Sequence, residues 1–274
     1  MGPLLLIGGH EEPQGAALEA FAANAGQGGR IALLTAATQD PQGAYRRYRE
    51  IFTRLGLGEV VHIGVEDRSD CAQREAAQAV RDADGIFFTG GDQLRITSLV
   101  GGTPVEAAIH AARGHGAVIG GTSAGASAMT DTMLVGGQDE EAARRASVRM
   151  CPGLGFLRAA VVDQHFAQRG RINRLIAALA QNPGILGIGI DENTAILVRD
   201  EERLEVLGAG TVTILDGRGA DLVEASEHDI DKPVALGSVA LWLLRQGYGF
   251  DLRLRAPVHS SASAGKTSAV PVLR

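Results

Sequence analysis

Gly121-Thr122-Ser123-Ala124-Gly125 directly follows the apolar run Ala117–Gly120 and leads into the helix-prone segment Ala124–Met129. These five residues fit the pattern G-x-S-x-G, which places a serine nucleophile on a sharp turn between a strand and a helix. A side chain two residues before or after Ser123 would strike the neighbouring strand or helix, so glycine is needed there. The sequence therefore predicts a nucleophile elbow, with helix N–H groups available to stabilise an oxyanion. The structural alternative is a phosphate-binding loop or a plain tight turn.

Short apolar runs alternate with amphipathic stretches through the first half of the chain. The apolar runs are Pro3–Ile7, Ile31–Thr35, Val60–Ile63, Gly85–Thr89 and Ala117–Gly120. The amphipathic stretches are Gly43–Leu55, Ala72–Asp82 and Pro104–Arg113. Because the apolar runs are continuous, they indicate strands that are buried on both faces of a parallel sheet. The pattern predicts a doubly wound, mostly parallel α/β sheet with helices on both faces and the elbow after a central strand.

The pattern changes in the second half of the chain. The alternation first continues with a strand at Ala159–Val162, a helix at Gly170–Gln181 and a strand at Ile185–Ile190. Three short runs then follow closely, at Ala195–Val198, Leu204–Val206 and Thr211–Leu215. Glycine or charged turns separate these three runs, which predicts antiparallel strands added at one edge of the sheet. The periodicity of Val234–Gln246 does not distinguish a strand from a helix.

Length and composition limit the class of protein. With 274 residues, 45% hydrophobic and 21% charged, the chain has an ordinary globular composition, which excludes a disordered chain or a fibre. We expect residues 1–256 to form a single α/β hydrolytic domain. The segment 257–274 is rich in Ser, Ala and Gly and is expected to be a flexible tail.

Charge, hydropathy and cysteine content indicate the compartment and the partners. The net charge of −6 argues against a nucleic-acid partner, and no apolar run is long enough for a membrane span. The apolar amino-terminal stretch lacks a preceding basic region and therefore predicts a first strand. Cys71 and Cys151 have no CxxC partner and are expected to be small core residues. We expect a cytoplasmic protein without a bound metal or cofactor.

A serine nucleophile needs a base and an orienting acid. His165 ends the polar stretch Asp163-Gln164-His165 at the carboxyl end of a predicted strand, where sites form in α/β sheets. Asp191 and Glu192 follow another buried strand, and one of them can contact the imidazole of His165. Spacing alone does not say which. The alternative interpretation is structural: His165 is a core histidine whose hydrogen bonds are made within the protein, and Asp191 and Glu192 belong to an exposed turn.

Two further groups of residues are candidates for binding. Arg169, Arg171 and Arg174 lie near the start of a predicted helix, where the helix dipole disfavours cations, so carboxylates from a substrate or from nearby acidic residues should compensate them. The loop Gly90-Gly91-Asp92-Gln93 follows a predicted strand. Its glycine N–H groups could complete an oxyanion hole opposite the N–H of Ala124, and Gln93 could hydrogen-bond a substrate.

The basic stretch 45–49 interleaves tyrosines with arginines. On a helix of an acidic protein, this pattern is interpreted as a solvated face.

The ordered set of motifs resembles cyanophycinase, a serine-type exopeptidase related to peptidase E. The resemblance extends from Ile7 to about Ile196, and its specific part is the run D-Q-H-F-x-x-R-x-R-x-x-R that begins at Asp163. By this resemblance, Ser123 is the nucleophile, His165 the base and Glu192 the orienting acid. The resemblance also implies substrate-binding roles for these residues: Gln93, Asp163, Gln164, Arg169, Arg171 and Arg174.

The resemblance further implies a substrate and an assembly. Cyanophycin has a polyaspartate backbone with arginine on each β-carboxyl, and the family releases β-aspartyl-arginine from it without a metal or cofactor, as a homodimer. Three other functions are compatible with the residues. The first is an α/β-hydrolase esterase, in which His228 would follow the acid. The second is a peptidase E-like or isoaspartyl dipeptidase, and the third is a non-catalytic carboxylate- or phosphate-binding protein.

Overall fold

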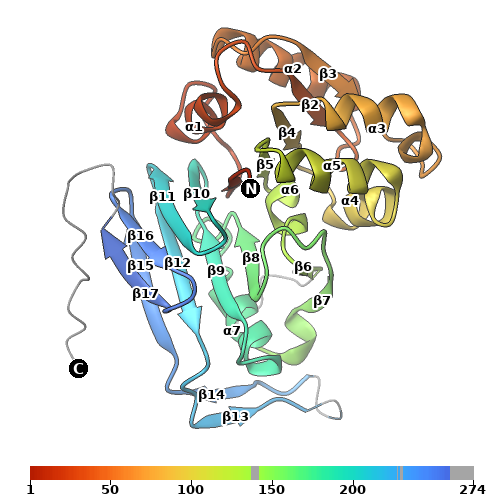
Figure 1. Ribbon diagram of the computed structural model, residues 1–274. Coiled ribbons are helices and arrows are strands. Elements are labelled where there is room, and N and C mark those ends of the chain that lie inside the picture. The colour runs from red at the N-terminus through yellow and green to blue at the C-terminus, as the bar shows by residue number, and fades with distance from the viewer. Residues whose placement is uncertain (137–141, 227, 229–230, 260–274) are drawn as a thin grey trace.

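A nine-stranded mixed sheet forms the centre of the computed structural model, which describes residues 1–136, 142–226, 228 and 231–259 (Figure 1). The strand order is β17-β16-β11-β10-β1-β5-β4-β2-β3. The parallel strands are β1 (Leu4–Ile7), β2 (Ile31–Leu34), β3 (Val60–Ile63), β4 (Gly85–Phe88) and β5 (Val118–Thr122). The antiparallel strands are β10 (Thr194–Arg199), β11 (Arg203–Gly208), β16 (Tyr248–Asp251) and β17 (Ala256–His259). The predicted fold class is confirmed, and 195–198 and 204–206 are antiparallel strands added at one edge. The run 211–215, predicted at the same edge, belongs instead to a second sheet, where it pairs with β9 (Leu186–Ile190).

Both faces of β1, β2, β4 and β5 are buried, which explains their unbroken apolar runs, whereas the edge strand β3 is partly exposed at its two middle residues. Leu4 and Leu6 of β1 belong to the hydrophobic core on one face, and Leu5 and Ile7 belong to the core on the other. The first core receives side chains from α3 (Arg74–Arg81), α4 (Gln93–Val100), α5 (Pro104–Gly114) and α6 (Ala124–Ala128). The second core receives them from α1 (Ala16–Ala25) and α2 (Pro41–Arg54). The sheet is therefore doubly wound, as predicted.

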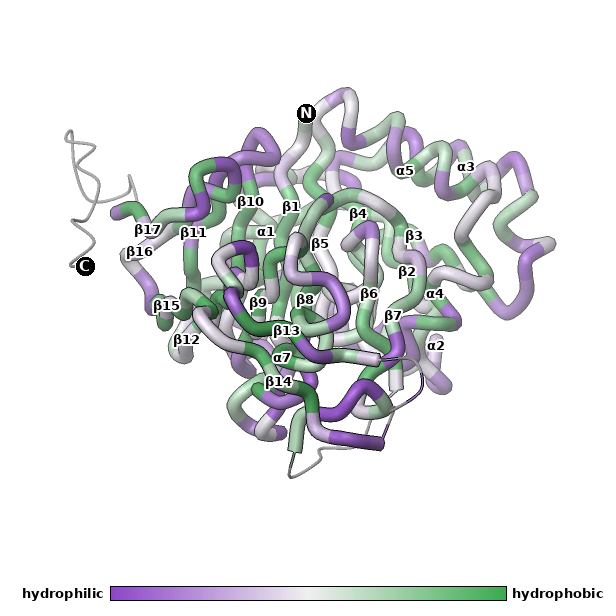
Figure 2. Tube along the Cα trace, turned by 90° about the horizontal axis from the view of Figure 1, so that it is seen from below, coloured by the Kyte–Doolittle hydropathy of each residue, from purple (hydrophilic) through white to green (hydrophobic). Residues whose placement is uncertain are grey.

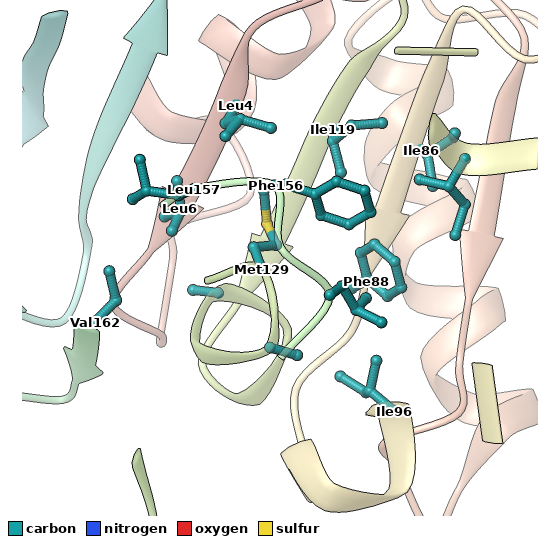
Figure 3. Close-up of a cluster of buried hydrophobic side chains, with 14 of the residues drawn as sticks. Leu4, Leu6, Ile86, Phe88, Ile96, Ile119, Met129, Phe156, Leu157 and Val162 are labelled. Carbon is teal, nitrogen blue, oxygen red and sulfur yellow. The ribbon is translucent and has the colours of Figure 1, made fainter. Parts of the chain in front are cut away.

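The views of the core agree with this division. Figure 2 shows hydrophobic residues along β1 and β10 in the middle of the molecule, and hydrophilic stretches on outer turns. Figure 3 shows part of the first core, where Phe88, Met129 and Phe156 lie close together. Cys71 is buried in this core, and Cys151 packs against it.

A second sheet carries the strands that the sequence predicted in the middle of the chain. Its order is β15-β12-β9-β8. The strands are β8 (Ala160–Gln164), β9 (Leu186–Ile190), β12 (Thr211–Asp216) and β15 (Ala240–Arg245). Strands β8 and β9 are parallel, and α7 (Ile172–Gln181) connects them and packs on the sheet. The chain then crosses from β9 to β10 of the large sheet through residues 191–193, so this crossover lies between the two sheets.

The remaining elements are short. They are the hairpin-like pairs β6 (Thr132–Val135) with β7 (Arg149–Pro152) and β13 (Leu222–Glu224) with β14 (Ala235–Gly237), and the 3-10 turns η1 (Asp70–Ala72) and η2 (Arg145–Ser147). The segment 234–246, whose periodicity did not distinguish a strand from a helix, forms the two strands β14 and β15. Strand β17 includes residues 257–259, so the sheet extends past the expected start of the tail. The remainder of that tail, 260–274, lies outside the described residues. In the described chain, no helix is both long and apolar enough to cross a membrane.

Candidate active site

Ser123 occupies the predicted elbow between β5 and α6. Its backbone has φ 52° and ψ −114°, a conformation that non-glycine residues rarely adopt. A Cβ on Gly121 would lie 2.6 Å from the carbonyl carbon of Gly125, and a Cβ on Gly125 would lie 2.5 Å from the backbone oxygen of Phe88. Both positions therefore require glycine, because neighbouring backbone atoms occupy the space that a Cβ would need. The strained turn presents the serine side chain at the end of the sheet.

Ser123, His165 and Glu192 form a continuous hydrogen-bonded chain. The Oγ of Ser123 lies 2.9 Å from Nε2 of His165, and Nδ1 of His165 lies 2.6 Å from Oε1 of Glu192. His165 follows β8, and Glu192 lies in the crossover from β9 to β10. The three carboxyl ends of β5, β8 and β9 thus meet at the junction of the two sheets. This is the arrangement in which an imidazole can take a proton from serine while a carboxylate orients it.

Asp191, the other acid that the sequence left open, has a different set of partners. Its Oδ1 accepts a hydrogen bond from the backbone N–H of Ala167 at 3.1 Å. Its Oδ2 accepts from the backbone N–H and the hydroxyl of Thr211 at 3.0 and 2.7 Å. Asp191 therefore holds the loop after β8 and the start of β12 together, and the adjacent carboxylate of Glu192 faces the histidine.

The loop after β1 holds the histidine from the other side. The backbone oxygen of Gly8 accepts the N–H of His165 at 2.8 Å, and that of Gly9 accepts the N–H of Asn193 at 2.8 Å. Gly9 has φ +102°, and a Cβ there would lie 2.3 Å from Cε1 of His165. The imidazole ring therefore occupies the space that a larger residue at position 9 would fill.

Burial lowers the pKa of His165 below the ordinary value of 6.5, and its hydrogen bond to Glu192 opposes this shift. The ring is therefore neutral at pH 7. With Nδ1–H donated to Glu192, Nε2 is left free to accept the proton of Ser123.

The resemblance to cyanophycinase placed Asp163, Arg171 and Arg174 in the substrate pocket, and the structure corrects this. The carboxylate of Asp163 is fully buried and forms two ion pairs. Its Oδ2 lies 3.0 Å from Nε of Arg174, and its Oδ1 lies 3.1 Å from Nη1 of Arg171. Nη1 of Arg171 also donates to the backbone oxygen of Gln164 at 2.7 Å, and Asp163 Oδ1 accepts the N–H of Gln164 at 3.1 Å. The acidic partner of both arginines is therefore within the chain, and this ion cluster fixes the backbone just before His165.

The other predicted binding residues divide into two groups. Arg169 is exposed and lines the pocket beside Ser123, and Oε1 of Gln164 lies 3.4 Å from the Oγ of Ser123. Gln93 is directed elsewhere, because its amide donates to the backbone oxygen of Leu134 at 2.8 Å. Its expected contact with substrate is therefore not supported by the structure.

Of the two expected oxyanion donors, one adjoins the serine in the chain, and the other follows a glycine that packs against it. Ala124 begins α6 directly after it. Gly90, next to Gly91, packs against it, since a Cβ on Gly90 would lie 3.3 Å from the Cβ of Ser123. Among the described residues, no backbone hydrogen bond is found for the N–H of Ala124 or Gly91.

A pocket of about 740 Å³ opens in front of Ser123. Its wall includes two cationic side chains, Arg47 and Arg169, and two anionic ones, Glu11 and Asp40. Glu11 is buried and accepts hydrogen bonds from the hydroxyl of Tyr48 and, at 2.5 Å, from that of Thr122. The pocket can therefore hold a ligand that carries charges of both signs.

Sequence reasoning missed this pocket wall. The stretch 45–49 was interpreted as a solvated face, which holds for the exposed Arg46 and Arg49. Tyr48 is only 5% exposed, and it lines the pocket together with Arg47. The tyrosine among arginines on an amphipathic helix was the available signal, but its partner Glu11 is 37 positions away in the chain.

Fold and site together define the class: a serine-type hydrolase with a mixed α/β fold and a serine on a strand–helix elbow. The chain belongs to Peptidase family S51, whose sequence profile matches residues 4–206, and it is a serine-type peptidase. The class excludes a protein that only binds a carboxylate or phosphate. The order Ser–His–Glu along the chain also leaves no place in the hydrogen-bonded chain for His228.

Curated relatives and solved structures support this assignment. The chain is 37% identical to "Cyanophycinase" of Geminocystis herdmanii over 229 residues, which cover 83% of this chain and 84% of that protein. It is 35% identical to "Cyanophycinase" of Nostoc sp. over 258 residues, covering 92% and 86%. The predicted resemblance to this family is confirmed.

Two solved structures show the same fold. A peptidase from an acI-B1 Actinobacterium superposes with a TM-score of 0.68 at 22% identity, over 92% of this chain and 97% of that one. A putative peptidase E from Listeria monocytogenes superposes with a TM-score of 0.54 at 18% identity, over 77% and 100%. At these identities the likeness concerns the fold alone.

Proposed function

We propose that the protein is an exopeptidase that hydrolyses cyanophycin to β-aspartyl-arginine through an acyl-enzyme. The observation that carries the proposal is the hydrogen-bonded chain Ser123–His165–Glu192 in a chain whose curated relatives are named cyanophycinase. The substrate is a polymer with a free carboxylate and a guanidinium group in its repeat. The mixed charges of the pocket wall are compatible with both.

In the proposed reaction, His165 is the general base and then the general acid. Its Nε2 takes the hydroxyl proton as the Oγ of Ser123 attacks the backbone carbonyl, and the N–H groups of Ala124 and Gly91 stabilise the oxyanion. His165 then gives this proton to the leaving amine, and the C–N bond breaks to leave an ester on Ser123. Water, deprotonated by His165, hydrolyses the ester and restores the serine. Glu192 keeps the imidazole oriented and stabilises its cationic form.

Substrate recognition is assigned to the pocket residues nearest the serine. Arg169 is exposed at the pocket wall and can pair with a substrate carboxylate in bidentate geometry. The amide of Gln164 is within reach of the reacting group. Asp40 is an exposed residue of the pocket wall at the start of α2, where it can meet a guanidinium group. An isopeptide-branched chain fits such a pocket better than a groove for an extended peptide.

Incubation of the purified protein with isolated cyanophycin, followed by mass spectrometry of the soluble products, tests the proposal. The expected product is the β-aspartyl-arginine dipeptide. Short isoaspartyl dipeptides serve as the competing substrate class in the same assay. Cleavage of those peptides with no release from the polymer would reject cyanophycin and retain a peptidase E-like or isoaspartyl dipeptidase activity.

We also propose that the protein works in the cytoplasm as a homodimer and binds no nucleic acid. Leu241 and Leu243 are 57% and 63% exposed on the edge strand β15, and exposed apolar side chains at a sheet edge favour association. The free thiols of Cys71 and Cys151 suit a reducing compartment, and the net charge of −6 opposes binding to phosphate backbones. Sedimentation equilibrium of the parent and of Leu243→Lys tests the dimer.

The acid limb of kcat/KM is expected to report the titration of His165. Activity needs the neutral imidazole, so it is full above the pKa of His165 and is lost as the pH falls through it. Because burial lowers this pKa, the midpoint of the limb should lie below 6.5. A profile of kcat/KM from about pH 4 to about pH 9 measures it. Glu192 raises the pKa of His165, so Glu192→Gln should move the midpoint to lower pH; a midpoint above 6.5 in the parent would contradict the assignment.

A further inference from the structure

His10 stands at the mouth of the active site and has no part in the proposed reaction. Its side chain is 72% exposed, and its Nδ1 lies 3.6 Å from Oε2 of Glu192. Its ring meets that of His165 edge-on, with centroids 5.2 Å apart. Two histidines and a carboxylate therefore converge at one point.

The backbone that carries His10 is held in place. The residues before it, Gly8 and Gly9, accept the N–H groups of His165 and Asn193, and the backbone N–H of Glu12 donates to the Asn193 side chain at 3.2 Å. His10 itself has φ +48°. The position of its backbone relative to Ser123, His165 and Glu192 thus follows from the fold, while the exposure of the side chain leaves the ring free to turn.

The three side chains have the chemistry and spacing of a zinc site. One ligand atom from each of His10, His165 and Glu192 can be chosen so that all lie within 4.8 Å of one another. Two histidines and one glutamate, with water in the fourth position, form an established tetrahedral zinc ligand set. Zinc–ligand bonds of about 2.0–2.1 Å place neighbouring ligand atoms about 3.3 Å apart, close to the present distance between His10 and Glu192.

A metal at this position would be incompatible with the proposed triad. The Nδ1 of His165 now donates its proton to Glu192 at 2.6 Å, and a metal bound by both must separate them by roughly 0.7 Å. The imidazole then carries its single proton on Nε2. That is the atom which must accept the proton of Ser123, so the ring can no longer act as a base. The proton moves within the ring, and no oxidant or other reactant is needed.

We propose that His10, His165 and Glu192 form an inhibitory binding site for a divalent transition-metal ion of the zinc type. Such an ion switches the enzyme off by occupying the orienting acid and the base together. The inhibition rests on the proposed function, whereas the binding rests on the geometry alone. Imidazole ligands favour Zn²⁺ over Mg²⁺ and Ca²⁺, so the site should discriminate against the two hard cations.

Isothermal titration of Ser123→Ala with ZnCl₂ tests the binding without any turnover, because this variant keeps all three ligands. We expect one Zn²⁺ per chain that depends on His10. The double variant Ser123→Ala/His10→Ala should bind Zn²⁺ at least about tenfold more weakly. Loss of a metal ligand costs at least as much affinity as loss of a residue that hydrogen-bonds to a ligand. His115→Ala removes an exposed histidine at the carboxyl end of α5 and should leave the affinity unchanged.

A second experiment measures inhibition of hydrolysis, and the rate of each variant with added metal is compared with its own metal-free rate. Zn²⁺ should inhibit the parent, and a chelator should restore its activity. Inhibition of His10→Ala should require a Zn²⁺ concentration at least about tenfold higher. MgCl₂ at the same concentration should have no effect. Absence of saturable binding by Ser123→Ala, or binding that His10→Ala does not weaken, would overturn the proposal. A protein that binds Zn²⁺ through His10 but does not cleave cyanophycin would retain the metal site and reject only the substrate.

Discussion

Replacement of Ser123 by alanine should lower the hydrolysis of cyanophycin by about 10⁴- to 10⁶-fold, the range seen when a nucleophile is removed from a serine triad. The reason is geometric, because the Oγ of Ser123 is the atom held 2.9 Å from Nε2 of His165. Alanine loses this oxygen and keeps the Cβ, so neither elbow glycine is affected. Release of β-aspartyl-arginine, followed by mass spectrometry, measures the loss.

The matched control is Ser98→Ala. Ser98 is an exposed serine on α4 whose hydroxyl donates within its own helix, to the backbone oxygen of Arg95 at 3.3 Å. The rate of cyanophycin hydrolysis by Ser98→Ala should stay within about twofold of the parent. The midpoint of thermal unfolding of both variants should differ from that of the parent by no more than surface substitutions usually cause. A Ser123→Ala enzyme that keeps a rate near the parent would exclude the elbow serine as nucleophile.

Replacement of Asp163 by asparagine should destabilise the fold by about 3–5 kcal/mol, the cost of removing one partner from a buried ion pair. The carboxylate is fully buried, and both Arg171 and Arg174 pair with it. Without its charge, these two guanidinium groups remain in the interior without their anionic partner. Urea unfolding followed by circular dichroism measures the free energy of unfolding.

The same variant distinguishes a structural role from the substrate contact that the resemblance implied. A buried ion cluster predicts a large loss of stability, together with a lower kcat because the cluster fixes the backbone before His165. A substrate contact predicts an unchanged free energy of unfolding and a raised KM. Asp82→Asn is the control, because Asp82 is exposed at the end of α3 and its loss should cost less than about 0.5 kcal/mol.

The features of the candidate active site that could be predicted from the sequence are those encoded by neighbouring residues. The elbow depends on glycines two positions either side of Ser123 and on the apolar strand before it, so its chemistry is readable within ten residues. The parallel strands are readable for a similar reason, since burial of both faces requires an unbroken apolar run. His165 was found because it ends such a strand among polar neighbours.

Other features depend on contacts that close over long stretches of chain. The choice between Asp191 and Glu192 depended on which of two adjacent carboxylates faces an imidazole 27 residues earlier. The division into two sheets was not predicted, because the apolar run of β9 is the same whichever sheet it joins. The wall formed by Glu11, Tyr48 and Thr122 joins residues up to 111 positions apart.

The sequence by itself determined the α/β class, the nucleophile elbow and the set of polar residues from which a site could be built. Only the tertiary structure decided which of those polar residues face the pocket and which compensate one another in the interior. Arg169 and Arg171 illustrate the difference, since they lie two positions apart, yet one is exposed beside Ser123 and the other is buried against Asp163. The physical reason is that a side chain's charge is local, whereas its desolvation and its partner depend on what the fold packs around it.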